Sequence, residues 1–277
     1  MKIMIRVDSG SVIGTGHLWR CMALADVLME RGCTVILVTR AHDGDVSKVF
    51  DDGRCMIYML PVNTKASIDD YSTWLGIDSE ELDAQESLSA VGPVDAVLVD
   101  HYGIGVVWEK TVKQHVTGPV VAIDDLGRAH AADVVVDYNL GSRTYTSSNI
   151  LQGPRYALMG RGFRTAQPGL HPGRIDRVHV CFGGSDPTNE TERVLKYFIN
   201  RNLDLLVDVV VCGANRNAKH IRDKCASLKN VTFMFNVTDM MKCLQINNLH
   251  RRRRKFCVRT SQNGTTINYY HACRKSD

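Results

Sequence analysis

The 277-residue sequence has no apolar run of the ~18 residues that a membrane-spanning helix needs, and no hydrophobic signal segment precedes its first predicted strand. Its nine cysteines show no Cys-x-x-Cys spacing, and several lie inside apolar runs (Cys21, Cys181, Cys212). An odd number of scattered cysteines argues against a disulfide framework or a zinc site. These absences, with few aromatic residues, predict a cytoplasmic α/β protein with reduced cysteines and no metal.

The net charge of +4 is unevenly distributed along the chain. Residues 249–277 hold eight Lys and Arg and one acidic residue, so they contribute +7, and all other residues together sum to −3. A slightly acidic body is not typical of a nucleic-acid enzyme. The basic segment 249–277 therefore needs a separate explanation.

A glycine-rich turn, Gly14-Thr15-Gly16-His17, follows the apolar run 3–7 and precedes apolar residues at helical spacing. Such a turn lets the backbone approach a ligand closely, and the helix N-terminus behind it favours an anion. We expect the His17 imidazole to project into this site. The alternative is a structural turn in which His17 caps the helix or faces solvent.

Short apolar strands alternate with helical stretches through the first half of the chain. This alternation predicts a parallel sheet covered on both faces, with ligands beyond the carboxyl ends of its strands. Three polar clusters fall at such ends: GTGH, DHYG (100–103) and DDLG (124–127). Their convergence favours a binding site at GTGH. The predicted strands are 3–7, 35–39, 56–60, 95–100, 120–123 and 134–137.

Residues 153–176 hold three of the seven prolines and five glycines, which predicts an interdomain crossing. Beyond it, strands are expected at 177–182, 205–212 and 231–235, and a helix at 189–200. GGSDP (183–187) repeats the strand–glycine–helix pattern and predicts a second phosphate contact. The alternative is a plain turn in which Asp186-Pro187 starts a helix. The expected parts are a first domain (1–152), the crossing (153–176), a second domain (177–248) and the basic segment (249–277). Two such domains favour a nucleotide-sugar site.

Several stretches together resemble one known family: IRVDSGSVIGTGHLWRCMALA, LVDHYG, IDDLGRAHAADVVVDYNLG, GPRYALM and CFGGSDPTNET. They are similar to the UDP-sugar hydrolases of pseudaminic acid biosynthesis, from residue 1 to about 243. The resemblance implies two Rossmann-like α/β domains, as in the GT-B glycosyltransferases that build peptidoglycan lipid II, with the second domain truncated here. It also implies metal-independent, inverting hydrolysis of UDP-2,4-diacetamido-2,4,6-trideoxy-β-L-altrose.

By this resemblance His17 matches the catalytic base that activates water, and Tyr102 matches a tyrosine of the site. A histidine can accept a proton from water at neutral pH, and a tyrosine hydroxyl can position that water or the sugar. Tyr102 could instead be an exposed loop aromatic, Asp100 is better interpreted as a strand-end cap, and Asp124 and Asp125 could be solvated. Further substrate contacts are expected from Gly14, Gly16, His101, Gly183, Gly184, Ser185 and Asp186, and weaker candidates are Arg161 and Asp124.

One departure from the family lies in the crossing segment, where the family reads close to YALLRPEF. The family's arginine position is Gly160 in this chain, and Arg161 follows one residue later. Because of this offset, the resemblance does not assign the family's arginine role to Arg161.

The resemblance stops at about residue 243, and the segment LHRRRRKFCVRTSQNGTTINYYHACRKSD shows no predicted strand or helical period. It could be a basic tail that binds RNA or anionic membranes. We favour a slipped reading frame, because a one-base shift with permitted codons turns RRRRKFCV into GGGGSSV and 262–277 into RMGRPSIIIMPAGNQ. Those strings match the glycine–serine loop, apolar strand and Asn-Gln pair that the family places there.

The sequence therefore predicts a monomeric UDP-sugar hydrolase without a cofactor, a nucleic-acid partner or a membrane partner. Without the family's C-terminal element, we expect this chain to show little or no activity. A UDP-sugar glycosyltransferase of similar shape, or a non-catalytic protein that binds through its basic tail, are the alternatives.

Overall fold

The computed structural model of the chain describes residues 1–140, 143–145, 149–166, 175–201, 205–237, 239–241, 243 and 254–258. The chain divides into two compact units, Met1–Arg161 and Gly162–Asp277, and the division lies inside the glycine- and proline-rich segment 153–176. Within the described ranges, no helix is both long and apolar enough to cross a membrane.

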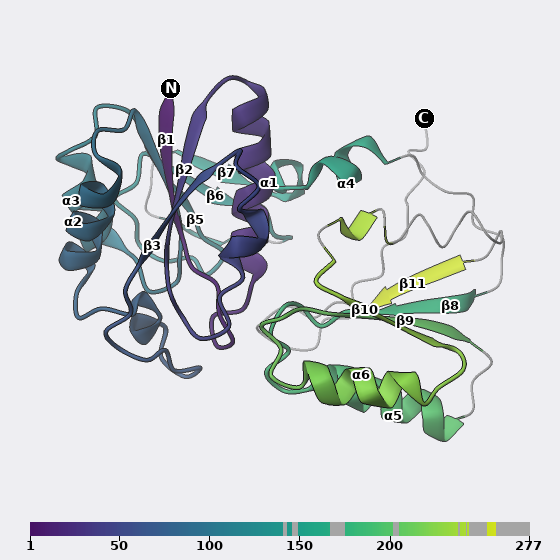
Figure 1. Cartoon of the computed structure of the whole chain (residues 1–277). Coiled ribbons are helices and arrows are strands. Elements are labelled where there is room, and N and C mark those ends of the chain that lie inside the picture. The colour runs from purple at the N-terminus through teal and green to yellow at the C-terminus, as the bar shows by residue number, and fades with distance from the viewer. Residues whose placement is uncertain are drawn as a thin grey trace. The chain divides into compact units, whose positions relative to one another are not determined.

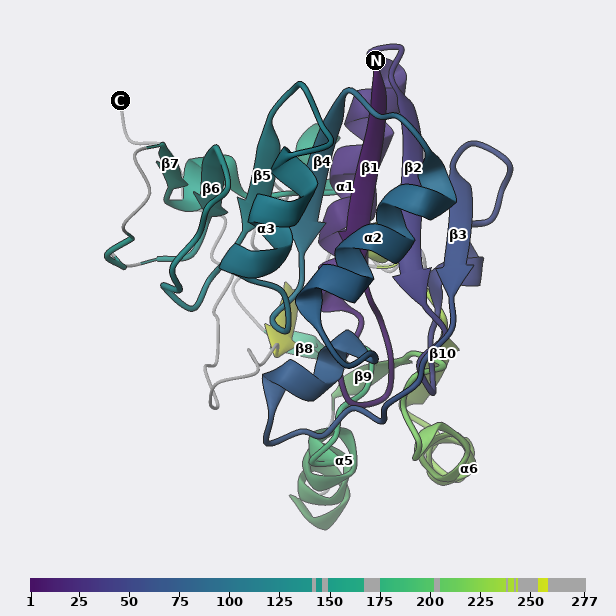
Figure 2. The same ribbon diagram turned by 90° about the vertical axis from the view of Figure 1, so that its left-hand side faces the viewer.

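The first unit is a parallel sheet of seven strands in the order β3-β2-β1-β4-β5-β6-β7, between helix α1 on one face and helices α2 and α3 on the other (Figures 1 and 2). The apolar runs predicted as strands all form strands, and β7 is one that the sequence did not predict. The strands are β1 (Lys2–Val7), β2 (Thr34–Arg40), β3 (Met56–Leu60), β4 (Ala96–Asp100), β5 (Val120–Ile123), β6 (Val134–Asp137) and β7 (Ile150–Gln152). The helices are α1 (Gly16–Glu30), α2 (Glu80–Val91) and α3 (Val106–Lys113), with short 3-10 turns η1 (Ser47–Phe50), η2 (Tyr71–Leu75) and η3 (Pro154–Tyr156).

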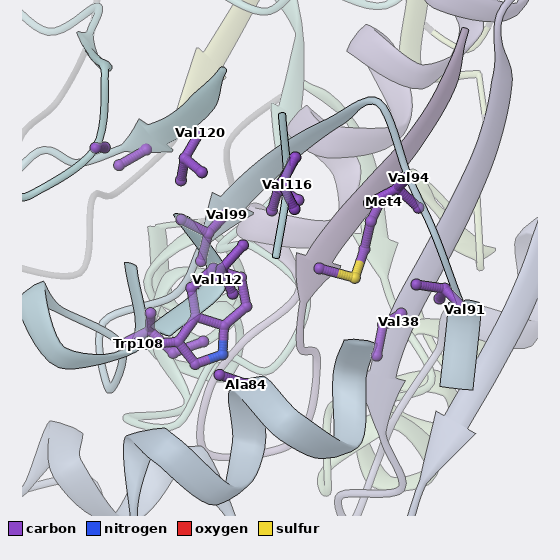
Figure 3. Close-up of a cluster of buried hydrophobic side chains, with 14 of the residues drawn as sticks. Met4, Val38, Ala84, Val91, Val94, Val99, Trp108, Val112, Val116 and Val120 are labelled. Atoms are coloured by element: carbon purple, nitrogen blue, oxygen red, sulfur yellow. The ribbon is translucent and has the colours of Figure 1, made fainter. Parts of the chain in front are cut away.

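The core of this unit lies between the sheet and helices α2 and α3 (Figure 3). Strand side chains such as Met4, Val99 and Val120 are buried against Trp108 and Val112 of α3. β4 is buried along its whole length, which explains its near-continuous apolar sequence. Burial of these side chains supplies the main stabilisation of the unit, at about 25 cal/mol per Å² of apolar surface.

An ion-pair network that the sequence did not reveal joins helix α2 to the sheet. Asp83 of α2 accepts hydrogen bonds from Arg6 (2.9 and 2.8 Å), from Nε of Arg40 (2.8 Å) and from the indole of Trp108 (2.9 Å). Arg6 also pairs with Asp8, and all four charged side chains are fully buried. Removing one member would leave an uncompensated buried charge, at a cost of about 3–5 kcal/mol.

The order of the strands determines where a ligand can bind. The chain runs outward from β1 to β3 and returns to β4 on the other side of β1, so Val7 and Asp100 are partners in the register. In open parallel sheets, this reversal leaves a crevice beyond the carboxyl ends of the two strands. The turn after β1 and the turn after β4 therefore lie next to each other.

The second unit contains a parallel four-stranded sheet, β10-β9-β8-β11, with α5 and α6 on one face (Figure 1). Its core is formed by Val178, Val180, Val207 and Val209 with Leu195 of α5 and Ile221 of α6. The elements are α4 (Arg161–Thr165), which spans the division, β8 (Ile175–Val180), α5 (Glu190–Arg201), β9 (Leu206–Val211), α6 (Ala218–Ala226), β10 (Val231–Phe235) and β11 (Arg254–Val258).

Strand β11 corrects the expectation that the basic segment 249–277 forms no strand. It pairs in parallel with β8, with Phe256 opposite Val178 and Val258 opposite Val180. Phenylalanine and valine favour strands, and the open edge of β8 offers unpaired backbone groups. Residues 249–253 and 259–277 lie outside the described residues.

Candidate active site

The turn after β1 is shaped by two glycines. Gly10 and Gly14 exchange backbone hydrogen bonds of 3.0 and 2.8 Å, and Gly14 has φ = 83°, a conformation that other residues rarely adopt. The turn delivers the chain into α1 at Gly16, so that His17 lies in its first turn and is only 4% exposed. Among the residues that the structure describes, no side chain caps this end of α1, and the first turn of the helix carries no acidic residue. His17 is therefore neither the cap nor the solvent-facing residue of the structural alternative.

His17 is held by Asp100, the last residue of β4. Its Nδ1 lies 2.7 Å from Oδ1 of Asp100, whose side chain is fully buried. Burial alone would raise the pKa of Asp100, but Arg20 and His17 hold it well below its usual range, so the side chain is a carboxylate. The preferred interpretation of Asp100 as a strand-end cap is wrong, because its oxygens are directed to side chains of α1.

Arg20, which the sequence analysis did not select, completes this arrangement. It lies one helical turn after His17, so both face the same side of α1. Its guanidinium binds both oxygens of Asp100 at 2.5 Å and donates to the hydroxyl of Tyr138 at 2.9 Å. It also lies 3.4 Å from Asp125. The signal that could have found it is its spacing of three residues from His17.

Tyr102 lies beside His17, with ring centroids 4.5 Å apart and the rings edge to face. It is 9% exposed and packs with Ile13 and Trp74, so the alternative of an exposed loop aromatic is wrong. Its hydroxyl donates to Asp125 at 2.6 Å. Burial first, and the Asp125 carboxylate second, raise the pKa of Tyr102 far above its usual range, so the phenol stays neutral.

We call His17, Arg20, Asp100, Tyr102, Asp125 and Tyr138 the His17 cluster. They come from α1 and from the ends of β4, β5 and β6. Contacts run from His17 through Asp100, Arg20 and Asp125 to Tyr102, whose ring returns to His17. The cluster therefore brings GTGH, DHYG and Asp125 of DDLG together, as the strand pattern predicted.

Two predicted site residues, His101 and Asp124, bind neighbouring backbone groups of the first unit. Nδ1 of His101 accepts the N–H of Gly103 at 3.0 Å, Nε2 lies 3.2 Å from Asp8, and the side chain is 1% exposed. Asp124 is also buried, and its oxygens accept three backbone N–H groups, from Leu126, Gly127 and Arg128, and the Nε of Arg128. Both side chains therefore have protein partners, and the prediction that they contact substrate stays a prediction.

The segment GRAH, from Gly127 to His130, supports the DHYG turn. Arg128 donates to the carbonyl oxygens of Tyr102 (2.6 Å), Ile104 (2.9 Å) and His101 (3.3 Å), and its guanidinium lies 5.7 Å from the centre of the Tyr102 ring. GRAH thus fixes the backbone that carries Tyr102.

In the second unit, Asp186 caps helix α5. One carboxylate oxygen accepts the N–H of Glu190 at 2.8 Å, and the other accepts that of Thr191 at 3.0 Å. Both carboxylate oxygens of Asp186 are therefore used at the start of α5, although the helix begins at Glu190 and not at Asp186-Pro187 as in the helix-start alternative. The predicted contact of Asp186 with substrate stays a prediction. Gly183, with φ = 77°, Gly184 and Ser185 form the turn before it. The N-terminus of α5 is therefore already occupied, unlike that of α1.

Arg161 does not join the His17 cluster. Its side chain is 78% exposed, at the start of α4, and lies 3.9 Å from Glu30. The described part of the chain contains no group of three His, Cys, Asp or Glu side chains arranged to hold a metal ion.

Together, the fold and the His17 cluster define a parallel α/β protein with a histidine–carboxylate pair at the carboxyl ends of the strands of its first sheet. An uncharacterized protein of Methanocaldococcus jannaschii is 23% identical over 225 residues, which cover 76% of this chain and 42% of that protein. The UDP-2,4-diacetamido-2,4,6-trideoxy-beta-L-altropyranose hydrolase of Campylobacter jejuni is 22% identical over 242 residues, 85% of this chain and 78% of that enzyme. The match therefore spans less than half of the archaeal protein. No family profile matches the chain.

Among solved structures, Arabidopsis thaliana UGT89C1 in complex with UDP-L-rhamnose matches with a TM-score of 0.55 and 12% identity, over 93% of this chain and 74% of that structure. A likeness at this identity concerns the fold alone. The predicted fold class, α/β with two Rossmann-like units of the GT-B type, is confirmed.

Proposed function

We propose that this chain descends from enzymes that hydrolyse a UDP-activated 2,4-diacetamido-2,4,6-trideoxy sugar, with His17 as the base. The observation that carries the proposal is the contact between Nδ1 of His17 and the buried Asp100 carboxylate. A carboxylate that accepts the Nδ1 proton leaves Nε2 with its lone pair, ready to take a proton. The sequence similarity to the Campylobacter hydrolase along 85% of the chain supports this reaction.

In the proposed reaction, Nε2 of His17 takes a proton from water while the water oxygen bonds to the anomeric carbon. The bond from that carbon to the UDP oxygen breaks, and UDP leaves with the electron pair. Because water enters on the face opposite UDP, the anomeric configuration inverts. Since UDP is already a good leaving group when its phosphates are bound, one base suffices.

The rest of the site would orient the substrate. The backbone N–H of Gly16, at the start of a helix with no acidic residue in its first turn, would suit a diphosphate oxygen. The hydroxyl of Tyr102 gives its proton to Asp125, so its oxygen offers lone pairs to water or to a sugar N–H. In the second unit, the backbone at Gly183, Gly184 and Ser185 remains a proposed phosphate contact.

The test measures UDP release from the altrose substrate with water as the only acceptor. The printed chain is compared with a frame-corrected chain that carries GGGGSSV and the downstream shifted sequence after residue 250. We expect release from the frame-corrected chain and a much slower rate from the printed one. His17→Gln should abolish release, while His115→Gln, at an exposed position just after α3, should not.

Two outcomes separate the alternatives. Release that appears only when a sugar acceptor is added would favour a glycosyltransferase. If the frame-corrected chain folds but releases no UDP, or if His17→Gln is as active as its parent, the proposal is wrong.

A further inference from the structure

Arg20 is the most connected side chain of the His17 cluster. Its Nε and Nη2 bind the two oxygens of Asp100, and its Nη1 binds the Tyr138 hydroxyl and approaches Asp125. The side chain is only 11% exposed. A guanidinium that binds both oxygens of one carboxylate is fixed in position and in charge.

The same guanidinium approaches His17 directly. Nδ1 of His17 lies 2.7 Å from Oδ1 of Asp100 and 2.9 Å from Nη2 of Arg20. A carboxylate only accepts hydrogen bonds and a guanidinium only donates them, so Nδ1 can serve one of these partners at a time. Either Nδ1 carries the proton and Nε2 is the base, or Nδ1 accepts from Arg20 and Nε2 carries the proton.

We propose that Arg20 is a positioning residue that neutralises Asp100, so that Asp100 accepts the Nδ1 proton of an uncharged His17 and leaves Nε2 free to accept a proton from water. The proposal rests on the proposed function, since it explains how His17 is kept ready as a base. Arg20 itself does not touch the reacting atoms.

The reason is electrostatic. An unopposed carboxylate 2.7 Å from an imidazole would stabilise the imidazolium, which has no lone pair on Nε2 and cannot act as a base. Arg20 supplies a permanent positive charge to the same carboxylate, and this charge opposes protonation of His17. Five titratable or charged groups face the side chains of His17 and Arg20. They are Asp100 at the end of β4, Tyr102, Asp125 after β5, Tyr138 after β6, and Cys21, whose Sγ lies 3.5 Å from Asp100.

Arg20 also connects His17 to Tyr102. Its guanidinium approaches the Asp125 carboxylate, which accepts the hydrogen bond of the Tyr102 hydroxyl. It also donates to the hydroxyl of Tyr138, just after β6. One side chain of α1 thus sets the relative positions of three strand ends. Lysine keeps the charge but cannot bind both oxygens of Asp100 in the same fork.

The test is NMR of the full chain labelled at histidine, which requires neither substrate nor activity. The His17 signals are assigned by their loss in His17→Gln. In the unaltered chain at high pH, we expect a protonated Nδ1 and an unprotonated Nε2. In Arg20→Gln, the pH midpoint of the His17 signals should rise by about 1 unit or more, and Arg20→Lys should give a smaller rise.

The matched control is Arg54→Gln, which removes another arginine paired with a carboxylate of α1, Asp26, but at a side chain that is 60% exposed. It should leave the His17 midpoint unchanged. A midpoint in Arg20→Gln within 0.3 units of the parent, in a chain that circular dichroism shows to be folded, would overturn the proposal.

The tautomer of the unaltered chain gives a second, independent decision, which stands even if Arg20→Gln does not fold. A protonated Nε2 would show that Arg20 donates to Nδ1, and the proposal would be wrong. If NMR shows the expected tautomer and midpoint shift but the frame-corrected chain releases no UDP, the proposed reaction is wrong and the role of Arg20 stands.

Discussion

Oδ1 of Asp100 lies 2.7 Å from Nδ1 of His17, although 83 residues separate them in the chain. β1 and β4 are neighbours at the reversal point of the sheet, so the turn after one strand meets the last residue of the other. The pair is therefore a product of topology. It gives a buried carboxylate partner to a histidine whose surrounding sequence shows only a glycine-rich turn, and on this contact the proposed role of His17 as a base depends.

Asp100→Asn should remove the group that fixes the His17 tautomer without changing the shape of the side chain. In the frame-corrected chain we expect the rate of UDP release to fall by about 10²–10⁴-fold, since the amide can donate to Nδ1 and stabilise the wrong tautomer. Initial rates at saturating substrate measure this. A rate within threefold of the parent would show that Asp100 is only structural.

Asp186→Ala should destabilise the second unit by about 1–2 kcal/mol, because two backbone N–H groups at the start of α5 lose their partner. Hydrogen exchange at Glu190 and Thr191 measures the effect where it arises. Asp223→Ala on α6, at a side chain that is 61% exposed, is the control and should have little effect. If both variants behave alike, Asp186 is not a cap.

His130 predicts a loss of stability at alkaline pH. Burial alone would lower its pKa, but Asp124 and Glu109 raise the pKa of His130 to about 9. Because the folded value lies above the unfolded value of ~6.5, this stabilisation is complete below pH ~6.5 and is lost as pH rises through about 9.

The expected loss is about 2 kcal/mol, since solvent screens part of the interaction. Thermal unfolding at a series of pH values measures it in the unaltered chain and in His130→Gln. The variant should be less stable at pH 6 and should show a flatter pH dependence up to pH 9.5. Parallel curves for the two chains would contradict the assignment.

The segment 249–277 gives a prediction about the gene. We expect the nucleotide sequence downstream of about codon 244 to be open, or nearly open, in the frame that spells GGGGSSV and RMGRPSIIIMPAGNQ. The frame-corrected chain should then unfold at a higher temperature than the printed one, because a family-like element replaces the basic segment. Codons that do not spell these residues would end the hypothesis.

The sequence alone determined most of the secondary structure of this protein. Near-continuous apolar runs such as 95–100 are typical of buried parallel strands, and their alternation with helices placed GTGH and DHYG at one edge of a sheet. It could not predict β11, because pairing with β8 depends on an edge that exists only in the folded unit.

The roles of the polar residues were decided by the tertiary structure. Asp100 and Asp186 both follow apolar strands and look alike in the sequence, yet one holds a histidine from another element and the other caps its own helix. In the sequence, Arg20 is not distinguished from other charged residues of a helix, and only the fold brings it into contact with Asp100 and Asp125. The physical reason is that a charge acquires its role from the partners that folding places within about 4 Å, and those partners lie far away in the chain.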